Sequence, residues 1–144
     1  MTKAVKDEEF HRVYLGLGSN LGDREENIRK AIALIGESIG LVIRQSSLIE
    51  TEPWGFESQN RFLNDVILVE TTLTPRQFLK ATQKIERALG RKKRISLHYQ
   101  DRPIDIDILL YDDLTVDEPD LKIPHPLMDQ RDFVMIPLNE IKPR

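Results

Sequence analysis

The chain has 144 residues, of which 40% are hydrophobic and 31% charged, as expected for one soluble globular domain with a real core. Its formal net charge of −3 argues against a general nucleic-acid binder, because such proteins carry a basic excess. The absence of cysteine excludes disulfides, thiolate metal sites and cysteine nucleophiles. Any chemistry must therefore depend on carboxylate, histidine, hydroxyl or cationic side chains.

The N-terminal segment shows no targeting signal. Residues 1–9 are polar and charged, and no stretch approaches the roughly 20 apolar residues needed to span a bilayer. We therefore expect a cytoplasmic monomer with no membrane or nucleic-acid partner. Residues 1–144 are expected to form a single domain, with 1–10 as a flexible extension.

Residues 12–18 are typical of a first strand that ends in a glycine-rich turn. The glycine spacing from Gly16 to Gly22 is G-x-G-x-x-x-G, which fits neither a dinucleotide fingerprint nor a Walker A loop. We interpret it as a strained turn that needs glycine. Asp23 followed by Glu26 resembles a capping box, and apolar residues then recur with helical spacing as far as Ile39.

The middle of the chain alternates between strands and a long loop. Residues 41–49 are rich in β-branched side chains and predict a second strand, and residues 62–73 predict a third. Between them, residues 50–61 contain proline, glycine, serine and asparagine, which predicts a loop of about a dozen residues. Loops of that length in compact domains are usually functional or disordered.

Thr74 and Pro75 mark the start of a second helix, which Gly90 ends. A basic loop over residues 91–100 precedes a strand over 104–111. The proline-rich tail is expected to form loops with at most one short helix near 128–133. The order β-α-β-β-α-β predicts a ferredoxin-like α+β sandwich, with a mainly antiparallel sheet and helices packed on one face.

The final strand carries the strongest chemical signal. Ile104, Ile106 and Ile108 alternate with Asp105 and Asp107, so strand geometry places both carboxylates on the other face, roughly 7 Å apart. Two such carboxylates are tolerated on a solvated face or are neutralised by a hard divalent cation. The upstream basic run 91–94 favours the second interpretation, since phosphoryl transfer from ATP needs both Mg²⁺ ligands and phosphate-binding cations.

Three other polar residues give weaker signals. Gln83 and Glu86 lie three positions apart and share a helix face, which on pattern alone is typical of exposed polar residues. His125 lies between two prolines and so has a rigid backbone, but a single histidine is usually structural.

Several motifs occur in one order along the chain and together indicate a family. They are Gly18-Ser19-Asn20-Leu21-Gly22, residues 50–55, Phe62-Leu63-Asn64, Gln83 with Glu86, Gly90-Arg91, residues 101–109, Ile123-Pro124-His125-Pro126 and residues 131–138. From about Val13 to Ile141, the chain resembles the 6-hydroxymethyl-7,8-dihydropterin pyrophosphokinase family of folate biosynthesis. Several spaced motifs are more specific than any single one.

The resemblance implies transfer of the diphosphate of ATP to the hydroxymethyl group of a reduced pterin, with release of AMP. It implies that Asp105 and Asp107 hold two Mg²⁺ ions. The other implied catalytic residues are Arg91, Lys93 and Arg102. The implied nucleotide-binding residues are Gln83, Glu86, Arg91, Lys93, His98, Tyr99, Arg102, Ile108, His125 and Arg131. The implied pterin-binding residues are Thr51, Glu52, Pro53, Trp54, Phe62, Asn64, Asp105 and Phe133.

The chain departs from the family pattern just before the aspartate pair. Many members have Arg-Trp-Gly-Pro-Arg there, whereas residues 98–102 of this chain are His-Tyr-Gln-Asp-Arg. His98 in place of arginine lowers the fixed positive charge. Tyr99 occupies the position of the tryptophan. Two alternatives stay open on sequence alone. One is a non-catalytic ferredoxin-like module that binds a small ligand, and the other is an ATP-dependent transferase with a different acceptor.

Overall fold

An antiparallel sheet forms the centre of the protein, in a computed structural model that describes residues 10–52, 60–90 and 101–143. Its main strands follow the order β2-β4-β1-β5, and the short β3 pairs with β4 as well. The strands are β1 (His11–Ser19), β2 (Leu41–Gln45), β3 (Ile49–Thr51), β4 (Phe62–Thr71) and β5 (Asp105–Tyr111). Within the described ranges, no helix is long and apolar enough to cross a membrane.

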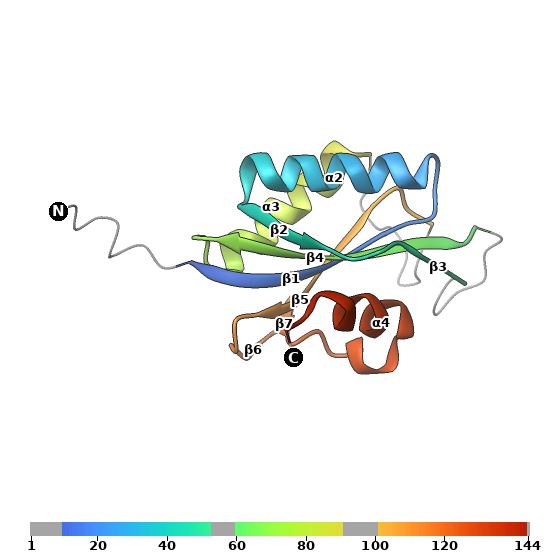
Figure 1. The fold of residues 1–144 in the computed structure, drawn as a ribbon. Coiled ribbons are helices and arrows are strands. Elements are labelled where there is room, and N and C mark those ends of the chain that lie inside the picture. The colour runs from blue at the N-terminus through green and yellow to red at the C-terminus, as the bar shows by residue number, and fades with distance from the viewer. Residues whose placement is uncertain (1–9, 53–59, 91–100, 144) are drawn as a thin grey trace.

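Helices α2 (Arg24–Ser38) and α3 (Pro75–Ala88) lie side by side on one face of this sheet (Figure 1). Helix α2 connects β1 to β2 with β4 between them, and α3 connects β4 to β5 with β1 between them. Two such interleaved β-α-β units are the hallmark of the ferredoxin-like arrangement. The predicted fold is therefore confirmed, including the position of these two helices on a common face.

The main core fills the space between the sheet and these two helices. Val13, Leu15 and Leu17 alternate along β1 and are at most 2% exposed. They pack in one cluster with Ile35 of α2 and Phe78 of α3, both fully buried. The alternation of β1 thus sends its aliphatic side chains to the face of α2 and α3, whereas Tyr14 points to the other face.

Both helices begin where the sequence predicts. The Asp23 carboxylate accepts a hydrogen bond from the Glu26 amide at 3.1 Å and caps α2. Thr74 and Gln77 form a full capping box, in which each side chain accepts a hydrogen bond from the other residue's amide. Pro75 follows as the first helical residue, where no hydrogen bond of its missing amide is lost.

The predicted second strand over 41–49 is divided into β2 and β3. Gln45 pairs with Ile67 but Ile49 pairs with Asn64, so the register against β4 shifts between them. Ser46 causes the break, because its hydroxyl accepts the Val66 amide at 2.9 Å and donates to Asp65 at 2.6 Å. As a result, residues 50 and 51 belong to a strand, whereas the sequence assigned them to a loop.

The tail is more regular than predicted. It forms a hairpin of β6 (Val116–Glu118) and β7 (Leu121–Ile123), a 3-10 turn η1 (Met128–Gln130) and the ten-residue helix α4 (Asp132–Ile141). Helix α4 lies on the sheet face opposite α2 and α3 (Figure 1). The prediction of at most one short helix was wrong. It took the prolines of the tail as helix breakers, whereas Pro137 lies inside α4.

Burial explains how α4 tolerates its proline. Val134, Pro137, Leu138 and Ile141 are all buried, and the three aliphatic residues join a second core with Tyr14 and neighbours on β4 and β5. Each buried aliphatic side chain contributes roughly 1.5–3 kcal/mol. Three of them exceed the cost of about 3 kcal/mol for an interior proline.

Two glycines at the end of α2 give a matched pair of stability tests. A Cβ at Gly40 would lie 2.0 Å from the Glu70 carbonyl oxygen, whereas one at Gly36 would meet nothing within 4 Å. We expect Gly40→Ala to lower the free energy of unfolding by about 1–3 kcal/mol or more, because backbone must move. Gly36→Ala should raise it by roughly 0.5–1 kcal/mol through helix propensity. Urea unfolding measures both, and equal stability of the two variants would contradict the close approach at Gly40.

Candidate active site

The site is built around two glycines of β1. Gly18 pairs with Asn64 on one side and Asp105 on the other, and Gly16 likewise pairs with Val66 and Asp107. Paired residues project to the same face, so these side chains flank a strip of bare backbone on the face opposite α2 and α3. The predicted glycine turn is confirmed at Gly22, whose φ is 70°, whereas Gly16 and Gly18 lie inside β1.

The glycines leave room that other residues would fill. A Cβ at Gly18 would lie 3.2 Å from the Asn64 Oδ1 atom and 3.5 Å from the Phe62 ring. The first of these distances is closer than normal packing allows without movement of the neighbour. Gly18 therefore keeps open the gap between Asn64 and the two aspartates.

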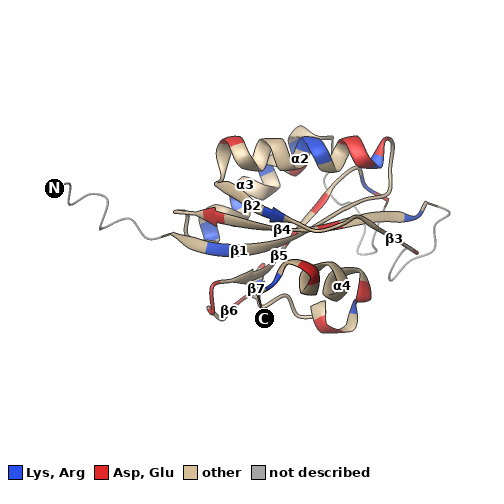
Figure 2. Ribbon diagram, in the orientation of Figure 1, with Lys and Arg blue, Asp and Glu red and all other residues tan. Residues whose placement is uncertain are grey.

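Asp105 and Asp107 lie on β5 with the predicted alternation. Ile106 and Ile108 point into the main core, and the two carboxylates face the glycine strip. In Figure 2 the acidic positions of β5 are red and the rest of that strand is tan. Burial, with the nearby charges of Asp105 and Glu86, raises the pKa of Asp107 to about 8. The pair is thus unfavourable when both carboxylates are ionised, and a cation would relieve the repulsion.

Helix α3 contributes Glu86 to this region. Its carboxylate accepts a hydrogen bond from the Ile106 amide at 2.8 Å, between the two aspartates in the sequence. Glu86 is only 9% exposed, so the pattern-based reading as an ordinary exposed residue was wrong. The contact fixes the start of β5 against α3.

A first pocket lies over the glycine strip. The Asn64 side-chain amide donates a hydrogen bond to the Thr51 hydroxyl at 2.9 Å, which fixes its orientation. Phe62 and Phe133 supply aromatic surface, and the Arg131 guanidinium lies 5.6 Å from the Phe133 ring centre. The lining residues are Gly16, Leu17, Gly18, Thr51, Glu52, Phe62, Asn64, Asp65, Arg102, Asp105, Asp107, Arg131, Phe133 and Val134.

A second, more polar pocket adjoins the first between α3, β5 and the tail. Its lining residues are Leu79, Thr82, Gln83, Glu86, Arg102, Asp105, Ile106, Asp107, Asp120, His125 and Arg131. The two pockets share Arg102, Asp105, Asp107 and Arg131. Two carboxylates and two guanidinium groups therefore stand on the wall between an aromatic pocket and a polar one.

Arg102 is held at the shared wall by a carboxylate and an aromatic ring. It is 7% exposed, its Nη1 atom lies 3.4 Å from Asp105 Oδ2, and its guanidinium carbon lies 5.8 Å from the Phe62 ring centre. Contacts with a carboxylate and an aromatic face hold a guanidinium in a defined orientation.

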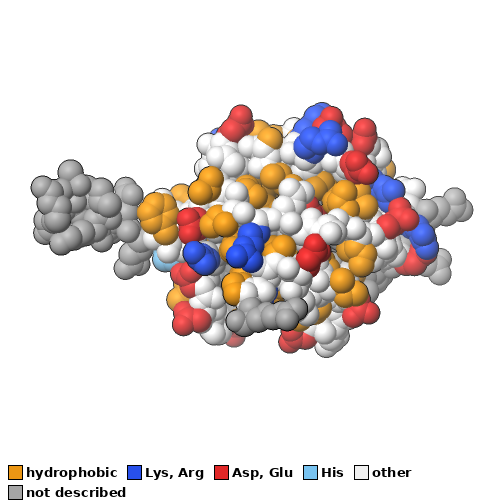
Figure 3. Space-filling view, in the orientation of Figure 1, with side chains coloured by type: hydrophobic (Ala, Val, Ile, Leu, Met, Phe, Trp, Pro, Cys, Tyr) orange, Lys and Arg blue, Asp and Glu red, His pale blue; other side chains and the backbone are white. Residues whose placement is uncertain are grey.

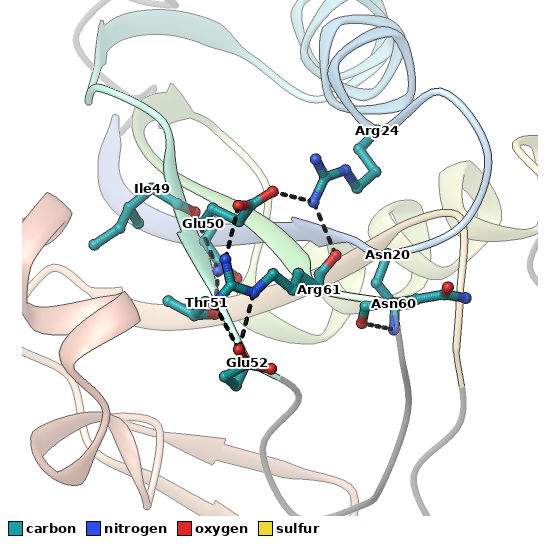
Figure 4. A network of polar contacts seen from close by, with 9 residues as sticks. Asn20, Arg24, Ile49, Glu50, Thr51, Glu52, Asn60 and Arg61 are labelled. Atoms are coloured by element: carbon teal, nitrogen blue, oxygen red, sulfur yellow. Dashed lines mark hydrogen bonds and ion pairs between the residues drawn. The ribbon is translucent and has the colours of Figure 1, made fainter.

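An ion-pair network borders the first pocket (Figure 4). Glu50 of β3 lies 2.8 Å from Arg24 and 3.3 Å from Arg61, and Arg61 also pairs with Glu52 at 2.6 Å. Hydrogen bonds from Arg24 and Arg61 lower the pKa of Glu50, with Arg24 as the larger cause. The network joins the first turn of α2 to the ends of β3 and β4.

The structure brings most of the predicted site residues together. Thr51, Glu52, Phe62, Asn64, Asp105 and Phe133 line the first pocket, and Gln83, Glu86, Arg102, His125 and Arg131 line the second. Ile108 instead packs in the main core and lines neither pocket. The predictions for Pro53, Trp54, Arg91, Lys93, His98 and Tyr99 fall outside the described residues.

The sequence interpretation missed several residues of the site. The glycine spacing from Gly16 to Gly22 was assigned to a turn, and the position of Gly16 and Gly18 beside the two aspartates was not predicted. Asp120 and Thr82, which line the second pocket, carried no motif that would single them out.

Fold and site together have the features of an α+β transferase of the phosphoryl-transfer class, with paired carboxylates between two adjoining pockets. Residues 14–143 match the family model described as 7,8-dihydro-6-hydroxymethylpterin-pyrophosphokinase (HPPK). The chain belongs to this family.

Named relatives agree with this assignment. The chain is 48% identical to the 2-amino-4-hydroxy-6-hydroxymethyldihydropteridine pyrophosphokinase of Porphyromonas gingivalis over 133 residues, covering 91% of this chain and 90% of the relative. It is 46% identical to the enzyme of the same name from Aquifex aeolicus, covering 91% and 80%. A wild-type Plasmodium falciparum HPPK-DHPS structure shares the fold, with a TM-score of 0.75 at 17% identity. That match covers 94% of this chain and 40% of the longer Plasmodium chain.

The second pocket sets the protonation state of His125. Burial lowers its pKa, the Arg131 charge lowers it further, and Asp105 opposes the shift. The folded protein thus holds His125 neutral where the unfolded chain protonates it. We expect its NMR titration midpoint to fall below 6.5. Stability should decrease as the pH drops below about 6.5, and His125→Gln should remove that part of the decrease. A midpoint at or above 6.5 would contradict this environment.

Proposed function

We propose that the chain catalyses transfer of the diphosphate of ATP to the hydroxymethyl group of 6-hydroxymethyl-7,8-dihydropterin, giving AMP and the pterin diphosphate in folate biosynthesis. One observation carries the proposal: Asp105 and Asp107 stand on the wall shared by the two pockets. A group transferred between substrates bound in the two pockets must pass these two carboxylates. Membership of the pyrophosphokinase family supports the same activity.

The first pocket suits a pterin. A pterin ring is flat, with hydrogen-bond donors and acceptors along one edge. Phe62 and Phe133 offer aromatic faces for stacking, and Asn64 offers its Oδ1 as an acceptor, because its Nδ2 donates to Thr51 and to the Ile49 carbonyl. The bare backbone at Gly16 and Gly18 lets a flat ring approach the sheet closely.

The second pocket suits ATP. Arg102 and Arg131 supply positive charge at the shared wall for the phosphates, and Gln83 and His125 offer polar contacts elsewhere in the pocket. Arg91, Lys93, His98 and Tyr99 remain proposed nucleotide contacts from the basic segment, and Ile108 a proposed contact by resemblance. Arginine suits this position because its planar group binds phosphate oxygens through more than one hydrogen bond.

The aspartate pair fits Mg²⁺. Within residues 10–52, 60–90 and 101–143, no cluster of three or more histidine, aspartate or glutamate side chains could hold a metal by itself. Mg²⁺ does not need one, since it is commonly bound by one or two carboxylates together with substrate phosphates and water. We propose two ions held by Asp105 and Asp107. When bound, they would neutralise phosphate charge and lower the barrier to attack by the hydroxyl oxygen.

The protein contributes alignment and charge. The attacking hydroxymethyl oxygen comes from the first pocket and the β-phosphorus from the second, with AMP as the leaving group. Arg102 and Arg131 stabilise negative charge that builds up at the shared wall during transfer. No covalent enzyme intermediate is required, because both substrates are held on one wall.

The alternatives are less well supported. A ligand-binding module without catalysis does not require half-buried paired aspartates beside two arginines, and the family membership of this chain does not favour such a module. An acceptor other than a pterin would leave the Asn64 amide and both aromatic rings without a clear role. Residues of one chain line both pockets, so we propose that a monomer in the cytoplasm suffices.

The activity is tested by incubating the protein with ATP, Mg²⁺ and the hydroxymethyl dihydropterin, and by following AMP. We expect AMP in equal amount to the pterin diphosphate, and little AMP without pterin. Removal of Mg²⁺ with EDTA should stop the reaction, and excess Mg²⁺ should restore it. Release of ADP, or AMP formation independent of pterin, would refute the proposed reaction.

Loss of either metal-binding carboxylate should abolish transfer. Asp105→Asn and Asp107→Asn keep side-chain shape but remove an anionic ligand, so we expect turnover to fall by roughly 100-fold or more. Asp113→Asn is the matched control, as an exposed residue that lines neither pocket. Thermal unfolding should show all three variants folded. Turnover near that of the control by either site variant would exclude it as an essential metal ligand.

The glycine strip gives a test for the first pocket alone. In Gly18→Ala the new methyl group crowds Asn64 and the Phe62 ring, so we expect the KM for pterin to rise roughly tenfold. Binding of a non-hydrolysable ATP analogue should stay unchanged, since Gly18 does not line the second pocket. Gly36→Ala, on α2, serves as control. An unchanged KM for pterin would move the pterin site away from this strip.

A further inference from the structure

Asn20 is a buried polar residue directly after β1 and has no role in the mechanism above. It is 2% exposed. The backbone amide of Asn20 donates a hydrogen bond to the Arg102 carbonyl at 3.1 Å. The side-chain Oδ1 of Asn20 accepts one from the backbone amide of Arg102 at 2.7 Å. Asn20 thus holds both backbone polar groups of the arginine on the shared wall.

Asp101 determines which way the Asn20 side chain points. Its Oδ1 atom accepts a hydrogen bond from Asn20 Nδ2 at 2.7 Å, and its Oδ2 atom accepts one from Asn60 Nδ2 at 3.1 Å. Asn20 Nδ2 also donates to the Asn60 carbonyl at 3.2 Å (Figure 4). With Nδ2 held by a carboxylate, Oδ1 must face the Arg102 amide. We refer to Asn20, Asp101 and Asn60 as the amide clamp.

The clamp and the side-chain contacts hold Arg102 at opposite ends. The clamp fixes its backbone, whereas Asp105 and the Phe62 ring hold its guanidinium. A long arginine side chain has many rotamers, and a small backbone shift would move its tip away from the reacting phosphates. Hydrogen bonds to a carboxylate are stronger than neutral ones, which suits Asp101 to this fixing role.

We propose that Asp101, acting through Asn20, is a positioning residue that sets the place of Arg102 in the transfer step. The proposal rests on the proposed function, because it assigns Arg102 to the transferring phosphates. It differs from a purely structural role in one respect. The effect of Asp101 on turnover must pass through the Arg102 side chain.

A double-mutant cycle tests this dependence. We expect Asp101→Ala to lower kcat roughly tenfold, as for loss of one hydrogen bond to a charged group, with little change in binding of a non-hydrolysable ATP analogue. In an Arg102→Ala background, the same change should lower kcat less than about twofold further. A merely structural role would give equal losses in both backgrounds. Asn60→Ala, which removes one partner of Asp101, should act in the same direction but more weakly.

The control is Arg29→Ala, which breaks an exposed 2.9 Å ion pair with Glu26 on α2, remote from both pockets. It should leave kcat unchanged in both backgrounds. Circular dichroism and thermal unfolding test whether each variant is folded. If Asp101→Ala does not fold, Asn60→Ala replaces it in the cycle. Additive losses, or wild-type kcat in both clamp variants, would overturn the positioning role. An inactive wild-type protein would instead refute the proposed function.

Discussion

Repulsion between Asp105 and Asp107 is the constraint that the rest of the site accommodates. Burial and neighbouring negative charge raise the pKa of Asp107 far above that of an exposed aspartate. The protein itself offsets only part of this repulsion. Arg102 approaches Asp105, and the Glu86 carboxylate is engaged by the Ile106 amide. The first pocket opens beside the pair over the glycines of β1, and metal and phosphate bound there would complete the charge balance.

The two faces of the sheet differ in how fully they are covered. On the face of α2 and α3, a continuous core with fully buried Val13, Leu15 and Phe78 secures the strands. On the other face, α4 and its smaller core cover only part of the sheet, and the glycine positions form the floor of the first pocket. The outer surface shows acidic and basic side chains intermixed on the face drawn in Figure 3. The first pocket therefore lies on the less covered face of the sheet, whereas the second pocket is also lined by residues of α3.

Local rules predicted the parts of the fold that depend on local interactions. Caps at Asp23 and Thr74 and the alternation around Asp105 need only neighbours in the chain, and these predictions were confirmed. The break at Ser46 depends on Asp65 and Val66, and helix α4 forms around Pro137 because of a core supplied by other strands. The role of Gly16 and Gly18 was missed for the same reason, since the residues that flank them lie on other strands. Family motifs located most pocket residues, but not the interactions that hold Arg102.

The position of β1 between β4 and β5 has a consequence for how the site comes into being. Asn64 and the aspartates reach the glycines only through pairings between distant parts of the chain. Helices α2 and α3 can form from local contacts, but neither pocket wall exists until β5 has joined the sheet. The chemical site therefore depends on contacts between segments that lie far apart in the sequence. A chain interrupted before β5 would carry neither carboxylate of the pair, so a fragment that ends there cannot have the activity.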